Sequence, residues 1–286
     1  MARGLDHIVH AVRDLDAAAA AYQRLGFTVG ARNRHPWGTH NRLVQFSGFF
    51  IELLTVAEPE KLGTDALSRL FGAPSRDFLE RHEGFWALLL ESRDAAGDAA
   101  QFGGAGIAAA PAVRFEREGQ RPDGTAVKVA FSLAFARDAR ADAGFAVCQQ
   151  HFPENFWNPA FQSHPNGARA VAGVVMVAEN PSDHHVFLSA FTGERELLAT
   201  SNGVAVKTPR GAIEVMTPAA YASHFGVAPP DVAGGARLAA LILAVRDGAG
   251  LATILDDAKI ATARRMGRIV VGPQTMMGAA IAFEQG

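Results

Sequence analysis

The stretch LDHIVHAVRDLDAA, residues 5–18, joins an apolar strand to the start of a helix. Asp14 or Asp16 can cap a helix that runs through AAAAAYQRLG, and Gly26 ends it. A short strand is predicted over residues 27–31. After a loop rich in proline, glycine and asparagine, the apolar runs RLVQF and FFIELLTV flank a tight SG turn and predict two more strands. The order of elements is therefore βαβββ.

The same order of elements returns three more times along the chain. A second copy starts at ALLLESRDAAGDAAQFGGAGI and continues through VRFERE, a turn at RPDGT, AVKVAFSLAF and GFAVCQQHF. A third starts at VAGVVMVAENPSDHHVFLSAFTG, and a fourth at RLAALILAVRDGAGLATILDDAKIATARRMG. Three copies place an Arg-Asp pair just after the first strand, at residues 13–14, 93–94 and 246–247. This repetition predicts an α+β fold of four tandem βαβββ modules.

The segment PENFWNPAFQSHPNG, which begins at residue 153, interrupts the repeats between the second and third copies. It is rich in proline and asparagine and shows little periodicity. We therefore predict a first domain over residues 1–157, a linker over 158–168 and a second domain over 169–286, each domain holding two modules.

Composition excludes several classes of partner. The net charge of -2 and the absence of a basic block argue against binding to nucleic acid or to a membrane surface, and no apolar run approaches the roughly 20 residues that span a bilayer. A single cysteine, Cys148, and the lack of a signal sequence lead us to expect a cytoplasmic protein. A monomer and a homodimer are both compatible with four modules in one chain.

Tandem βαβββ modules opened by LDHIVHAVRDLDAA and closed by FFIELL resemble the vicinal oxygen chelate superfamily, and within it the glyoxalase-like domain proteins. The resemblance implies that paired modules form half-open, cup-shaped mixed sheets flanked by helices. It also implies a divalent metal ion held by residues of the first and last strands. The superfamily includes glyoxalase-type lyases, isomerases, ring-cleaving dioxygenases and metal-free proteins that sequester drugs, so the fold alone does not identify the reaction.

The family pattern falls on His7 in the first strand of the first module and on Glu52 in its last strand. Aligning the modules places no second histidine in a first strand, since the positions equivalent to His7 are Ala87, Gly173 and Ala240. The counterparts of Glu52 in the last strands are Gln149 or His151, Glu214, and Glu284. The resemblance therefore favours one active cup, in the first half of the chain.

The expected metal site consists of His7, Glu52 and His151, and its ion would be zinc, nickel, manganese or iron. Strand alternation is expected to turn Phe145, Gln149 and His151 to one face and Cys148 to the other. Substrate contacts are expected from the following residues: Trp37, Asn41, Phe50, Phe131, Phe145 and Gln149. The WGTHN loop resembles one at the cup entrance of glyoxalase-like proteins, so His40 is a candidate acid or base, and Glu52 is the second catalytic candidate.

Structural roles are the alternative for each of these residues. A lone strand histidine is more often structural than a ligand, His151 could bond the backbone at a strand end, and His40 could belong to an ordinary loop. Glu52 lies among Phe50, Ile51 and Leu53, where a metal ion, a buried cation or water must satisfy its carboxylate.

The preferred hypothesis is an enzyme of lyase or isomerase type that acts on a small, partly apolar substrate bearing oxygen atoms. A metal ion at His7 and Glu52 would act as a Lewis acid and stabilise an enolate-like anion. The alternatives are a metal-free sequestering protein of the bleomycin-resistance type and a ring-cleaving dioxygenase. A further alternative is that only the first half is functional and the second half covers it.

Overall fold

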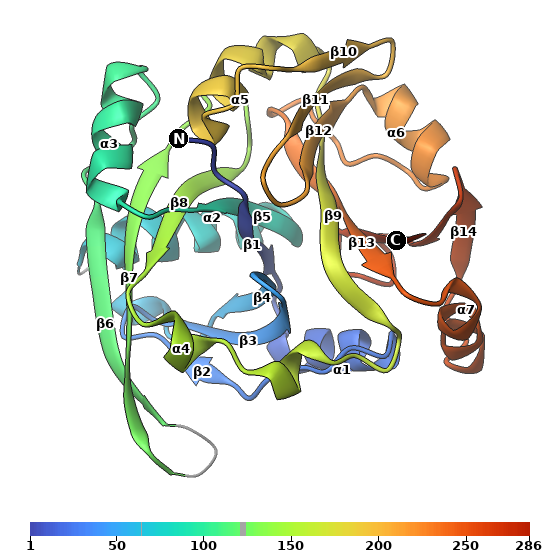
Figure 1. Cartoon of the computed structure of the whole chain (residues 1–286), viewed down its shortest axis with the longest axis horizontal. Coiled ribbons are helices and arrows are strands. Elements are labelled where there is room, and N and C mark those ends of the chain that lie inside the picture. The colour runs from blue at the N-terminus through green and yellow to red at the C-terminus, as the bar shows by residue number, and fades with distance from the viewer. Residues whose placement is uncertain (64, 121–123) are drawn as a thin grey trace.

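The computed structural model describes residues 1–63, 65–120 and 124–286, and its strands form two eight-stranded sheets (Figure 1). Each sheet takes its strands from two successive modules, and both sheets contain parallel and antiparallel pairs. The predicted α+β fold of four modules in two mixed sheets flanked by helices is therefore confirmed. Residues 121–123, in the turn predicted at RPDGT, lie outside the described residues.

The first sheet has the strand order β2-β3-β4-β1-β5-β8-β7-β6. The first strands of its two modules, β1 and β5, pair antiparallel at its centre, and each pairs in parallel with the last strand of its own module. Its strands are β1 (Leu5–Ala11), β2 (Asn33–Arg34), β3 (Thr39–Phe46), β4 (Phe49–Val56), β5 (Gly84–Glu91), β6 (Val113–Gln120), β7 (Ala126–Ala136) and β8 (Gly144–Gln150). The module helices are α1 (Leu15–Arg24) and α3 (Ala95–Gly104).

The second sheet repeats this arrangement in the order β10-β11-β12-β9-β13-β16-β15-β14. Its strands are β9 (Ala168–Val177), β10 (Leu198–Thr200), β11 (Gly203–Lys207), β12 (Ala212–Met216), β13 (Arg237–Val245), β14 (Thr262–Arg265), β15 (Arg268–Val271) and β16 (Ala280–Gln285). Its helices are α5 (His185–Thr192), preceded by a 3-10 turn (Pro181–His184), α6 (Pro218–Phe225) and α7 (Gly248–Asp257). Within the described ranges, no helix has the length and apolar character needed to cross a bilayer.

The Arg-Asp pair recurs because its aspartate caps a helix. Asp14 accepts hydrogen bonds from the backbone N–H groups of residues 16 and 17, Asp94 accepts one from that of residue 97, and Asp247 one from that of residue 249. A capping carboxylate satisfies backbone donors that have no partner within the helix. The repeated signature therefore marks helix starts in three modules.

The strand predicted over residues 27–31 does not form. Gly26 follows the end of α1 and has a positive φ of 80°. The next segment makes one backbone hydrogen bond to β3, from the Gly30 N–H to the Leu43 carbonyl, and the Gly30 carbonyl accepts a hydrogen bond from the Arg42 side chain. Pairing begins later, in the two-residue strand β2. One apolar run after a helix does not distinguish a strand from a packed loop.

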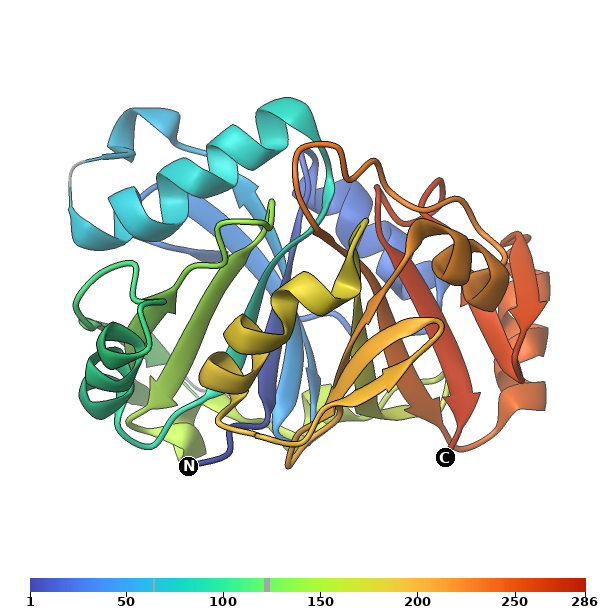
Figure 2. The ribbon, with the colours of Figure 1, turned by 90° about the horizontal axis from the view of Figure 1, so that it is seen from above.

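Two segments outside the repeats pack on the first sheet. Between β4 and β5 lie a 3-10 helix (Pro59–Lys61), a π-helix (Ser68–Gly72) and α2 (Ala73–Arg81), and this segment runs across the first half (Figure 2). The predicted linker contains α4 (Pro153–Phe156) and a 3-10 helix (Pro159–Gln162). The Gln45 amide holds it by donating to the Phe156 carbonyl and accepting from the Asn158 N–H. The division into two domains with a linker stays a prediction.

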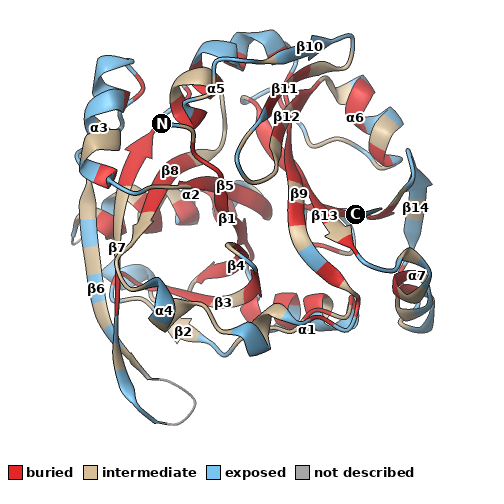
Figure 3. Ribbon diagram, viewed as in Figure 1, coloured by how far each residue is buried: buried red, intermediate tan, exposed pale blue. Residues whose placement is uncertain are grey.

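The two halves share one apolar core. Buried side chains from the outer faces of both sheets and from the module helices form one continuous cluster. Figure 3 shows that the central strands of both sheets are mostly buried. Phe27 of the first half stacks on Phe283 of β16 with ring centroids 6.0 Å apart. The concave faces of the sheets carry two separate, smaller clusters. The halves are therefore joined by packing as well as by the chain.

His10 lies in this shared core, on the helix side of β1. Its Nδ1 is 2.9 Å from the hydroxyl oxygen of Tyr22, and its Nε2 is 3.2 Å from the carbonyl oxygen of Met277 in the second half. A neutral ring that donates from Nε2 and accepts the Tyr22 hydroxyl proton at Nδ1 satisfies both contacts. Burial lowers the pKa of His10 from 6.5 to about 4, against the opposing effect of the backbone carbonyls around Met277.

His10 should make stability depend on pH. Because its pKa is lower in the folded than in the unfolded chain, acid favours the unfolded chain. Stability should fall by about 1.4 kcal/mol per pH unit as the pH drops from about 6.5 toward about 4. The free energy of unfolding in urea should fall between about pH 7.5 and about pH 5 by about 2 kcal/mol less in His10→Gln than in wild type. His185→Gln, at an exposed position, is the control. Equal losses in wild type and His10→Gln would contradict this account.

Candidate functional site

A cavity lies on the concave face of the first sheet, between the strands and the segment that ends in α2. Its apolar wall is mostly aromatic and includes Trp37, Phe50, Phe71, Phe115, Phe131 and Phe156. Its polar lining residues are His7, Asn33, His35, Asn41, Glu52, Arg117 and Cys148. They come from β1, β2, β3, β4, β6 and β8 and from the loop between β2 and β3. The cavity therefore combines an apolar body with a few converging polar groups, as small-molecule sites do.

His7 is held in a defined orientation on the cavity wall. Its ring stacks on Phe50 with centroids 4.2 Å apart and planes 15° apart. Its Nδ1 is 2.9 Å from Oδ1 of the preceding residue, Asp6, and both residues are buried. Neighbouring strand residues ordinarily point to opposite faces, but the pairing of β1 with β5 shifts register between Leu5 and His7. This irregularity accompanies the contact between the two side chains.

Glu52 is a buried carboxyl group in the same wall, with 6 % of its surface exposed. Asn41 donates a hydrogen bond of 2.5 Å from Nδ2 to Oε1 of Glu52. Burial raises the pKa of Glu52 above its ordinary value, while the charge of His7 and the Asn41 hydrogen bond act in the opposite direction. A buried carboxyl group with a raised pKa is suited to accept and return protons near neutral pH.

Cys148 completes a cluster of potential ligands. One ligand atom each from Asp6, His7 and Cys148 lies within 4.8 Å of the others, and all three residues are buried. Burial raises the pKa of the Cys148 thiol, and the negative charges of Asp6 and Glu52 add to the effect. Glu52 therefore lies within electrostatic range of both His7 and Cys148. Asp6, His7 and Cys148 form a group that could hold a metal ion, and Glu52 lines the same cavity.

The chemistry of this donor set fits a divalent cation. Imidazole, carboxylate and thiolate are the ligand types that zinc and other late transition metals take in proteins. A histidine ligand commonly bonds a carboxylate through its other ring nitrogen, and the contact between His7 Nδ1 and Asp6 has this form. A cation would also favour the ionised forms of Glu52 and Cys148, which burial alone disfavours.

Some of the predicted site residues meet in the cavity and others do not. Six of them line it: His7, Trp37, Asn41, Phe50, Glu52 and Phe131. The other four lie outside it: His40, Phe145, Gln149 and His151. Each of these four has a partner elsewhere in the fold.

His40 faces away from the cavity. Its Nε2 is 2.9 Å from Oε1 of Glu58, at the start of the segment that leads to α2. The alternation of β3 turns Asn41 and Leu43 into the cavity and His40 to the other side. The histidine of this region that lines the cavity is His35, whose ring stacks on Trp37 with centroids 4.4 Å apart. Burial, followed by the charge of Arg117, lowers the pKa of His35 to about 3, so its ring is neutral at ordinary pH.

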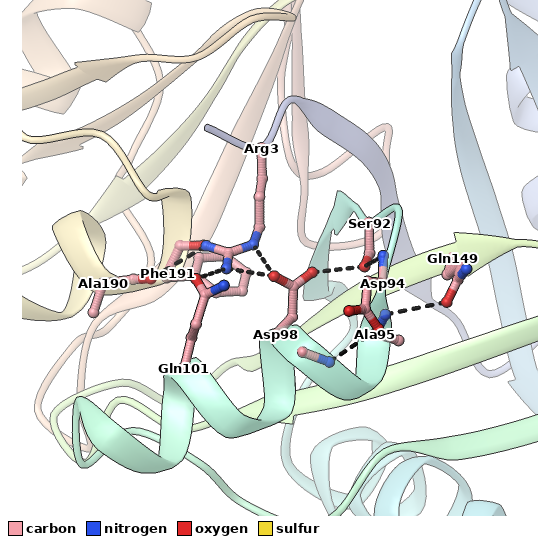
Figure 4. Close-up of polar contacts among 10 residues, drawn as sticks. Arg3, Ser92, Asp94, Ala95, Asp98, Gln101, Gln149, Ala190 and Phe191 are labelled. Carbon is pink, nitrogen blue, oxygen red and sulfur yellow. Dashed lines mark hydrogen bonds and ion pairs between the residues drawn. The ribbon is translucent and has the colours of Figure 1, made fainter. Parts of the chain in front are cut away.

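Phe145 and Gln149 point to the helix side of β8, opposite to the expected face. Gln149 accepts a hydrogen bond of 3.1 Å from the Ala95 N–H at the start of α3 (Figure 4). It also donates one of 2.8 Å to the Arg93 carbonyl. The ring of Phe145 packs on Phe187 with centroids 4.7 Å apart. Cys148 faces the cavity instead. Side chains alternate along β8 as expected, but the face predicted to line the cavity points to the helices, and the opposite face lines the cavity.

His151 lies just beyond the end of β8, and its Nε2 is 2.8 Å from the hydroxyl oxygen of Ser132 on β7. It is half-buried and does not line the cavity. The structure therefore brings Cys148, and not His151, close to His7.

Sequence reasoning missed four polar cavity residues, and one of them carried a recognisable signal. Along VRFERE, residues 113, 115 and 117 share one face and residues 114, 116 and 118 the other. Arg117 is thus the charged residue on the otherwise apolar face, which predicts a cation in the cup. Asn33, His35 and Cys148 carried no comparable signal. Asn33 and His35 lie in a sequence segment rich in proline, glycine and asparagine with no periodic pattern, and Cys148 lies in a strand that is apolar on both faces.

The concave face of the second sheet is closed by its own side chains. Tyr221 and Phe225 of α6 stack with ring centroids 4.7 Å apart and belong to the apolar cluster on that face. Glu214, the counterpart of Glu52, lies in a separate hollow near the β10–β11 hairpin, and burial raises its pKa. The second half therefore presents no equivalent of the aromatic cavity among its described residues.

Comparisons with solved structures show the same fold. The chain aligns with a hypothetical protein from Staphylococcus aureus at a TM-score of 0.69 and 13% identity, covering 99% of this chain and 100% of the other. It aligns with a mutant of 4-hydroxymandelate synthase from Streptomyces coelicolor at a TM-score of 0.59 and 12% identity, over 100% and 93% of the two chains. A fusion of a xylose isomerase-like TIM barrel with a 4-hydroxyphenylpyruvate dioxygenase gives a TM-score of 0.55 at 11% identity, over 100% of this chain and 49% of the fusion. At these identities the likeness concerns the fold alone.

The sequence itself matches a family. No curated protein is a significant match to the chain. The model of the glyoxalase-like domain matches residues 5–192, which include the whole first sheet, the segment after β8, β9 and α5. The chain therefore belongs to the glyoxalase-like domain family.

Proposed function

We propose that the chain is a metal-dependent enzyme of lyase or isomerase type that moves a proton on a small, partly apolar, oxygen-bearing substrate in the cavity of the first sheet. The observation that carries this proposal is the cluster of Asp6, His7 and Cys148 beside the buried carboxyl group of Glu52. His7, Glu52 and Cys148 would hold the cation, with Asp6 orienting His7. A divalent cation there supplies a Lewis acid that polarises a substrate oxygen.

The residues around the cluster have separate tasks in this proposal. Glu52 would carry the proton as well as hold the cation, because it is the carboxylate on the cavity wall and Asn41 fixes its orientation. Phe50 holds the ring of His7 by stacking. The aromatic wall, which includes Trp37 and Phe131, excludes water from the reacting groups and packs against the apolar part of the substrate.

Metal-free sequestration of a small molecule is the second candidate. It is favoured by the mostly aromatic lining of the cavity. It is also favoured by the second module, where the strand pairing puts Ala87 at the position of His7 and Ala146 at the position of Glu52. The ring-cleaving dioxygenase alternative has less support. The positions equivalent to His7 in the second half are Gly173 and Ala240, and α6 fills that cup.

Titration with cobalt(II) tests the proposed site. Wild-type protein treated with chelator and then freed of it should bind about one equivalent of Co²⁺, and His7→Ala should bind at least ~100-fold more weakly because a direct ligand is lost. His151→Ala is the matched control, since His151 lies just after β8, the strand that carries Cys148, but contacts Ser132. If His151→Ala weakens binding as much as His7→Ala does, the assignment of the ligands is wrong. Thermal unfolding of the metal-free variants shows whether each one folds.

A further inference from the structure

Arg117 is a cation on the wall of an apolar cavity. It lies on β6, where Phe115 and Arg117 turn to the cavity, while Arg114 and Glu116 point outward and are exposed. Arg117 and Phe156 also line a second hollow that continues along the β6–β7 hairpin, a hollow that His7 and Glu52 do not reach. Arg117 therefore lies where the cavity meets this second hollow.

Arg117 has no acidic partner among the residues that the structure describes. Its Nη1 donates a hydrogen bond to the Glu118 carbonyl at 3.4 Å. The carboxylate of Glu116, on the outer face, is already paired with Arg114 at 3.0 Å and with Lys128 at 2.6 Å. Arg117 is also half-buried, and its desolvation lowers its pKa. A half-buried charge of this kind gains most from an anion that arrives with a ligand.

The surroundings of Arg117 limit the kind of anion. Asn33 lines both hollows together with Arg117, and its amide already donates to Asn41. His35 is neutral, so the polar lining residues supply one fixed positive charge where the two hollows meet. A phosphate monoester carries a charge of about -1.5 to -2 and would remain under-compensated. A carboxylate matches a single guanidinium in charge and in its planar geometry.

We propose that Arg117 binds the carboxylate of a monoanionic ligand whose ring-sized apolar body lies along the aromatic wall toward His7 and Glu52. The inference rests on the proposed function only in placing the substrate in this cavity. It identifies the substrate class as small aromatic or branched apolar carboxylic acids. Trp37, Phe115, Phe131 and Phe156 provide the apolar contact area.

Binding of defined probes to full-length, chelator-treated protein tests this inference. The probes are 3-phenylpropanoate, its neutral isostere 3-phenylpropanamide, and phenyl phosphate, each followed by calorimetry. Wild type should bind 3-phenylpropanoate at least ~10-fold more tightly than the amide, as expected for a hydrogen-bonded charge pair. Arg117→Gln should lose that preference and keep its affinity for the amide, and Arg117→Lys should retain part of the preference. Arg114→Gln, from the outer face of the same strand, should behave as wild type.

Several outcomes would overturn the inference. They are equal affinity of wild type for the acid and the amide, no binding of the acid up to about 10 mM, tighter binding of phenyl phosphate than of the acid, or an equal loss in Arg114→Gln. Unfolding temperatures of the variants show whether each one is folded. Because the protein is chelated and no turnover is measured, failure of the proposed metal site would leave this comparison intact. Loss of the carboxylate preference would equally leave the cobalt titration unchanged.

Discussion

Replacing Glu52 by glutamine is expected to stabilise the metal-free protein and to abolish its stabilisation by divalent cations. The carboxyl group is buried, and its pKa is raised above the ordinary value of 4.5. The folded chain therefore binds its proton more tightly than the unfolded chain does, and stability is lost as the pH rises above about 4.5. Glutamine removes this cost and can still accept the hydrogen bond from Asn41. A gain of about 1–3 kcal/mol at neutral pH follows.

The same substitution removes a charged ligand from the proposed site. At a cation concentration 100 times the dissociation constant, the free energy of unfolding of wild type in urea should rise by about 2.7 kcal/mol. That of Glu52→Gln should rise by almost nothing at the same concentration. Glu58→Gln is the matched control, because that carboxylate lies outside the cavity and contacts His40 and Lys61. A Glu52→Gln protein that is less stable than wild type without metal and equally stabilised with it would show that the carboxylate has a structural role.

Phe27→Ala is expected to lower the free energy of unfolding by about 3–5 kcal/mol and the melting temperature by roughly 10 °C. Phe27 is 3 % exposed and lies between the halves, with its ring against Phe283 of β16, Phe46 of β3 and His164. Removing the ring leaves a cavity in the core that both sheets share. Because that core is continuous, both halves should unfold together in one transition.

Urea unfolding followed by tryptophan fluorescence and by circular dichroism checks this prediction. Tryptophan reports on the first half, since all three tryptophans, Trp37, Trp86 and Trp157, precede β9. Circular dichroism reports on both halves. Leu198→Ala, at a position 64% exposed, should change stability by less than about 0.5 kcal/mol. Two separated transitions in wild type would contradict a shared core.

The modular fold was predictable because the sequence of each module contains local signals for its helix and strands. The Asp14, Asp94 and Asp247 caps mark helix starts, and apolar runs bounded by turns mark strands. The packing of one half on the other could not be predicted, because it has no local sequence signal. Phe27 and His10 have no local feature that distinguishes a contact between halves from ordinary burial, because the partner residues Phe283 and Met277 lie more than two hundred positions away.

The candidate site was predictable only where a strand identified its own inner face. Glu52 stands out as a carboxylate within an apolar strand, and His7 as its partner in the first strand. In β8 both faces are apolar, so alternation does not say which face lines the cup. The sequence therefore predicted Gln149 and His151 in the cup, whereas the structure places Cys148 there. The contact of Asp6 with His7 depends on a register shift that only the pairing of two strands reveals.

The spectrum of wild-type protein during the cobalt(II) titration tests the central claim most directly. A cation held by His7, Glu52 and Cys148 predicts saturation near one equivalent, with a near-ultraviolet charge-transfer band from the thiolate of Cys148, the one cysteine of the chain. The band should be absent in Cys148→Ala. No saturable binding, or saturation at one equivalent without a thiolate band, would contradict this account of the site.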